Sequence, residues 1–63
     1  MEAYQERVVV EKAELDEKRR RLGFFIGSEV FRSLPSEERN RLEQQAIAMT
    51  TYSNILGERI ANF

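Results

Sequence analysis

Two positively charged residues interrupt an apolar stripe in the first half of the chain. At the helical period of about 100° per residue, Lys12 and Arg19 share one helix face with Val8, Leu15, Leu22 and Ile26, with Tyr4 at its edge. A buried, unpaired cation is costly, so each must extend its head to solvent, find a carboxylate or bind an anionic ligand. The sequence leaves all three interpretations open, and the third would make the pair a phosphate site.

The two tyrosines are the aromatic residues best suited to ligand binding, because each offers a flat face and a hydroxyl group. Tyr4 lies one helical turn before Arg7, and Tyr52 lies one heptad before Arg59. A tyrosine ring can stack on a base while a neighbouring arginine holds a phosphate. For the four phenylalanines, packing in the core or at the corner is the simpler interpretation.

The arginine run that follows has a simpler explanation than ligand binding. Arg20 and Arg21 point away from the apolar stripe, and the spacing predicts that they pair with Asp16 and Glu17 at i,i+4. The same spacing predicts a pair between Glu14 and Lys18. The stretch "GFFIG" that comes next is no phosphate loop, because neither a lysine–hydroxyl pair nor a preceding strand accompanies it.

Composition excludes several classes of function. The chain has no cysteine or histidine, and no metal-ligand cluster or serine with a plausible base is visible, so we expect no catalysis, metal or cofactor. Ten basic against eleven acidic residues give a net charge of −1, which disfavours duplex nucleic acid. No apolar run approaches the roughly 20 residues of a membrane span, and the N-terminus lacks the pattern of a secretory signal. A cytoplasmic protein without membrane contact is expected.

Helical periodicity predicts an all-α fold of one domain, residues 1–63. The first helix covers about residues 2–22 or 2–26, a short helical corner follows Ser28, and the second long helix begins at Pro35 or Ser36. The second helix has its own stripe of Leu42, Ala46, Met49, Ser53, Leu56 and Ile60, with Phe63 at the edge. The two helices should form an antiparallel hairpin. Because so small a hairpin cannot bury both stripes, we expect a homo-oligomer.

Three stretches of the chain carry a family resemblance. They are "RVVVEKAELDEK" (residues 7–18), "FIGSEVF" (25–31) and "MTTYSNILGERI" (49–60). They resemble a family of small phage and prophage proteins named after a gene of a crAss-like phage. The match covers nearly the whole chain but departs from the family pattern at Arg19–Arg21 and Gly23, which puts the continuity of the first helix there in question.

The layout is similar to phage anti-defence proteins that act as nucleotide sponges. This similarity implies a non-catalytic binder in the host cytoplasm that sequesters a cyclic oligonucleotide or a cyclic ADP-ribose derivative. It also implies that Tyr4 stacks on a base while Lys18 or Arg19 holds a phosphate. The candidate ligand-binding residues are therefore Tyr4, Arg7, Lys12, Lys18, Arg19, Tyr52 and Arg59. The alternative function is a protein–protein interaction module, a phage adaptor or an inhibitor of a host protein; an enzyme is a third, weaker alternative.

Overall fold

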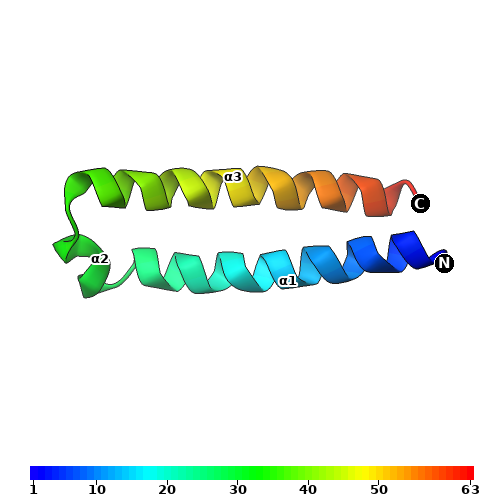
Figure 1. The fold of residues 1–63 in the computed structure, drawn as a ribbon, viewed down its shortest axis with the longest axis horizontal. Helices are drawn as coiled ribbons and strands as arrows, with labels where there is room; N and C mark the ends of the chain where they lie inside the picture. Colours follow the sequence, from blue (N-terminus) through cyan, green and yellow to red (C-terminus); the bar gives the residue numbers. More distant parts are fainter.

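Three helices make up the chain in this computed structural model, which describes all of residues 1–63. They are α1 (Ala3–Ile26), α2 (Glu29–Ser33) and α3 (Ser36–Ala61). The two long helices, α1 and α3, lie side by side and antiparallel, with α2 at the end where the chain turns and both termini at the other end (Figure 1). The result is a rod of 46 × 15 × 13 Å. The predicted all-α hairpin is confirmed.

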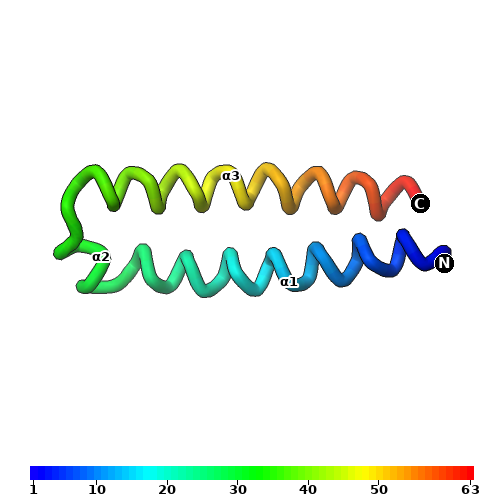
Figure 2. Tube along the Cα trace, viewed as in Figure 1, coloured from blue at the N-terminus to red at the C-terminus, as the bar shows by residue number.

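Local hydrogen bonds fix the helix ends. Gln5 accepts the backbone N–H of Glu2 at the start of α1, and the Ser28 hydroxyl accepts the N–H of Phe31 at the start of α2. Pro35 immediately precedes α3, whose first turn is acidic. The helix α1 continues without a break through Gly23, so the arginine run does not interrupt it. The chain reverses only between α1 and α3 (Figure 2).

The core between the long helices is small. Its buried members are Val8, Leu15 and Leu56, with Met49 and Ile60 packed against them. At the corner, the buried Phe31 meets Phe25 edge-on, with ring centroids 6.2 Å apart. Only five of the 63 residues are buried in all. The two predicted stripes therefore face each other, but a single copy leaves many large apolar side chains exposed.

None of the three helices combines the length and the apolar character that crossing a membrane requires.

The size of the core makes its central leucine critical. Leu56 is 1% exposed, and truncating a buried leucine to alanine costs about 2–5 kcal/mol. We expect Leu56→Ala to lower the free energy of unfolding by an amount in this range, measured by urea denaturation followed by circular dichroism. Val10→Ala, at a position that is 54% exposed, is the control. Equal denaturation midpoints for the two variants would contradict this core.

Candidate functional site

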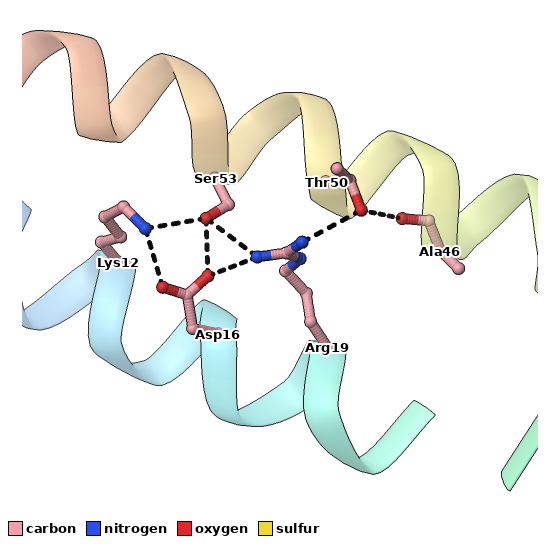
Figure 3. A network of polar contacts seen from close by, with 6 residues as sticks. All are labelled: Lys12, Asp16, Arg19, Ala46, Thr50 and Ser53. Carbon is pink, nitrogen blue, oxygen red and sulfur yellow. Dashed lines mark hydrogen bonds and ion pairs between the residues drawn. The ribbon is translucent and has the colours of Figure 1, made fainter. Parts of the chain in front are cut away.

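A carboxylate holds both cations of the apolar stripe. Asp16 lies between Lys12 and Arg19 on α1, and its side chain reaches the contact with α3 (Figure 3). Lys12 Nζ donates to Asp16 Oδ2 at 2.8 Å, and one terminal nitrogen of Arg19 donates to Oδ1 at 2.9 Å. From α3, the Ser53 hydroxyl donates to the same Oδ1 at 2.5 Å. Each carboxylate oxygen is therefore bound by at least one donor.

Two hydroxyl groups of α3 complete the cluster. The Ser53 oxygen accepts from Lys12 Nζ at 3.1 Å and from the Arg19 guanidinium at 3.3 Å. The other terminal nitrogen of Arg19 donates to the Thr50 hydroxyl at 3.3 Å, and Thr50 donates in turn to the backbone carbonyl of Ala46 at 3.0 Å. Ser53 is 1% exposed, so this hydroxyl needs its partners, and the cluster supplies all of them.

Because Gly57 has no side chain, the Lys12 side chain can pack closely against α3. A Cβ atom at Gly57 would lie 3.3 Å from Lys12 Cε, closer than an ordinary van der Waals contact. Glycine at this position therefore lets the lysine stem pass close to the helix while its ammonium group reaches Asp16 and Ser53.

The cluster carries a net charge of +1, because two cations share one carboxylate. Hydrogen bonds from Lys12, Ser53 and Arg19, in that order of importance, hold the pKa of the Asp16 carboxyl far below its usual range. The three charged side chains are each about one third exposed. The Nε atom of Arg19 is buried without a hydrogen-bond partner. The cluster is thus electropositive, partly open and not fully satisfied.

The structure decides how Lys12 and Arg19 are accommodated in the stripe: they find a carboxylate. The predicted pairing of Asp16 with Arg20 is wrong, because Asp16 turns toward α3 and Arg20 pairs with Glu17 instead, at 2.6 Å. The predicted pair of Glu17 with Arg21 is present at 3.7 Å. Glu14 and Lys18, in contrast, form no ion pair in the chain.

Tyr4 lies far from Lys18 and Arg19 along α1. Its ring packs edge-on against Phe63 at the open end of the hairpin, with centroids 5.9 Å apart. Fifteen residues separate Tyr4 from Arg19, which corresponds to about 22 Å along a helix. One small ligand therefore cannot touch Tyr4 and either Lys18 or Arg19 of the same copy.

The other candidates lie outside the cluster. Arg7 lines a shallow hollow on the outer face of α1 together with three carboxylates, which disfavour an anion there, and Lys18 lines a second hollow beside it. Tyr52 and Arg59 are exposed on α3. From the helical period, both flank the edge of the α3 stripe opposite Thr50, away from the cluster. The structure thus brings together only Lys12 and Arg19 of the seven predicted residues.

Sequence reasoning missed three members of the cluster, Asp16, Thr50 and Ser53, and the glycine that Lys12 packs against, Gly57; Ser53 was predicted only as part of the α3 stripe. A signal for Asp16 was present, because it lies four residues after Lys12 and three before Arg19, the two spacings at which helical side chains meet. Thr50 and Gly57 become identifiable only when the register of α3 against α1 is known.

The chain was compared with known protein families, curated proteins and solved structures. The model of a family described as Sequestin matches residues 2–62 of this chain. No curated protein and no solved structure matches it.

The cluster predicts how stability depends on pH. Because the folded pKa of Asp16 lies below the unfolded value of about 3.9, its contribution is complete above about pH 5 and is lost as the pH falls. We expect Asp16→Asn to lower the melting temperature at pH 7 and to reduce the loss of stability between about pH 5 and pH 3. Thermal denaturation across this range measures both effects. Glu14→Gln is the control, and identical pH profiles for the two variants would refute the role of Asp16.

The two helical glycines provide a matched pair. Nothing lies within 4 Å of a Cβ atom built at Gly23, whereas one at Gly57 meets Lys12. We expect Gly23→Ala to raise the free energy of unfolding by about 1 kcal/mol through helix propensity. Gly57→Ala should raise the free energy of unfolding by less, because the added methyl group forces Lys12 to move. A larger gain for Gly57→Ala in urea denaturation would show that Lys12 does not pack there.

Proposed function

The chain belongs to the Sequestin family, and we propose that it is a non-catalytic phage protein that sequesters a nucleotide messenger of bacterial immunity. The family name denotes sequestration. The similarity in layout to anti-defence sponges supplies the ligand class, a cyclic oligonucleotide or a cyclic ADP-ribose derivative. Sequestration needs tight binding and no bond making, and it takes place in the host cytoplasm, where such a messenger is produced.

The observation that carries the proposal is the sharing of one carboxylate by Lys12 and Arg19. The cluster keeps a charge of +1 and unused N–H donors on both cations, one of them the unpartnered Nε of Arg19. A phosphate is the natural acceptor for such donors, and charge-assisted hydrogen bonds are about twice as strong as neutral ones. Because Arg19 Nε is buried, the Arg19 side chain must shift before a phosphate can reach this donor.

A second copy of the chain is part of the proposal. The hollows of a single hairpin are shallow, and the one that Arg7 lines also has three glutamates on its border. The distance from Tyr4 to Lys18 or Arg19 also excludes one ligand shared by these residues in a single copy. A homo-oligomer can close a pocket and bring the tyrosine of one copy to the cations of another.

The direct test is whether the protein carries or binds a nucleotide. The chain has no tryptophan and two tyrosines, so a co-purifying nucleotide will dominate the absorbance at 260 nm. The purified protein is denatured, and the released material is identified by mass spectrometry. In parallel, cyclic dinucleotides, larger cyclic oligonucleotides and cyclic ADP-ribose derivatives are titrated calorimetrically. We expect one class to bind and to be released intact, whereas a chemically altered product would indicate an enzyme.

A matched pair of variants connects binding to the cluster. Arg19→Gln removes a cation of the cluster, and losing a charged hydrogen bond of about 1.5–3 kcal/mol should weaken binding tenfold or more. Arg41→Gln removes a cation that pairs with Glu38 on the surface, so its affinity should stay unchanged. Circular dichroism verifies that both variants fold.

Exposed apolar side chains on α3, Ile47 and Ile55 among them, are the observation that favours the alternative function. If no small molecule binds or is released and a pull-down recovers a specific host or phage protein, the chain is an interaction module instead of a sponge.

A further inference from the structure

The exposed face of α3 differs in character from that of α1. No charged residue occurs from Gln44 to Gly57, whereas charged residues recur along α1 from Glu6 to Arg21. Within the uncharged stretch, Ile47 is 61% exposed and Ile55 is 49% exposed. Large apolar side chains without neighbouring charges are typical of the centre of a protein interface.

This face is also symmetric about Thr51. Ile47 and Ile55 lie four residues before and after it, and Gln44 and Glu58 lie seven residues before and after it. Asn40 and Asn62 lie eleven residues away on either side. Offsets of four, seven and eleven residues return to the same side of a helix, so these residues form one face. All of them are exposed, and we call them the α3 outer face: Asn40, Gln44, Ile47, Thr51, Ile55, Glu58 and Asn62.

We propose that the α3 outer face binds a second copy of the chain, antiparallel and about a two-fold axis at Thr51. A two-fold interface uses the same patch on both subunits, so residue i meets j and j meets i. Ile47 of one copy then packs beside Ile55 of the second copy at both ends of the apolar centre. Outside them, the Gln44 amide donates to the Glu58 carboxylate of the second copy, and Asn40 meets Asn62 of the second copy.

The dimensions of the rod favour this lengthwise contact. A stable interface buries on the order of 800 Å² per partner, about a sixth of the 4748 Å² exposed by this chain. The end of the rod, 15 × 13 Å, is too small to supply that area. The α3 outer face extends over 22 residue steps, about 33 Å along the helix. The outer face of α1 has a similar length, but Glu6, Glu14 and Glu17 border its hollows and would have to be desolvated.

This interface deepens the proposed function, because it is the contact through which copies assemble. Its role in ligand binding rests on the proposed function. Tyr52 follows Thr51 directly and flanks the apolar seam of this face. An antiparallel two-fold places the Tyr52 side chains of both copies on the same edge of the dimer, close to the axis. Two aromatic rings from different copies then lie close together, on the edge of the dimer opposite the one that carries Thr50 and the cluster.

Cysteine cross-linking tests both the face and the direction of packing, since the chain has no cysteine of its own. Thr51→Cys lies on the axis and should form a disulfide dimer rapidly under mild oxidation. Ile47→Cys alone should not form a disulfide dimer. The two copies of residue 47 lie about 12 Å apart along the helix direction, beyond the roughly 7 Å limit between the Cα atoms of a disulfide. An equimolar mixture of Ile47→Cys and Ile55→Cys should form the mixed dimer. Val10→Cys, on the outer face of α1, is the control.

Sedimentation of the cysteine-free protein completes the test. The natural chain should sediment as a dimer or a multiple of it, and Ile55→Lys should shift it to smaller species while circular dichroism shows that it remains helical. Thr51→Cys cross-linking no faster than Val10→Cys overturns the interface, and rapid cross-linking of Ile47→Cys alone overturns the antiparallel direction. Nucleotide binding without Thr51 cross-linking contradicts this interface only. Cross-linking without nucleotide binding contradicts the proposed function only.

Discussion

One carboxylate organises the contact between the two long helices. Asp16 binds Lys12 and Arg19 from its own helix and Ser53 from the facing helix, so it neutralises part of the charge that the stripe brings into the contact. Without it, two cations would face each other across a buried hydroxyl. Sliding α3 by one turn would separate Ser53 from Asp16 and break the hydrogen bond between them. We infer that this cluster, more than the small core, selects the register of the hairpin.

The parts of the fold that depend on local periodicity were predictable. The spacing of Val8 and Leu15, and of Ser53 and Leu56, placed the buried faces correctly, and the hairpin follows from them. The ion pairs were less predictable, because each charged side chain of α1 has several oppositely charged side chains within reach on the same helix. Asp16 is about 80° from the centre of the stripe, and only the hydroxyl groups of α3 decide that it turns inward. The second copy that belongs to the proposed site cannot be derived from the periodicity of one hairpin.

The same limit applies to the ligand site. Periodicity identified Lys12 and Arg19 as unusual. It did not show that Asp16, a residue of the same chain, supplies the carboxylate that binds both of them. Under the proposed function, a phosphate at this site would share these cations with Asp16. Tyr4 packs against Phe63 and Tyr52 lies exposed on α3, so neither tyrosine belongs to the cluster in one chain. A small core, a positively charged cluster and an uncharged outer helix face thus occur together on one short hairpin, and the proposed binding of a ligand by an oligomer rests on this combination.

The most direct measurement of the central claim is the titration of the Asp16 carboxyl carbon, followed by NMR in the intact protein. If Lys12, Ser53 and Arg19 all donate to this group, its resonance should stay unchanged down to about pH 3 and titrate only below it. A midpoint near the ordinary value of about 4 would show that Asp16 is a solvated surface charge, and the account of the helix contact would then be wrong.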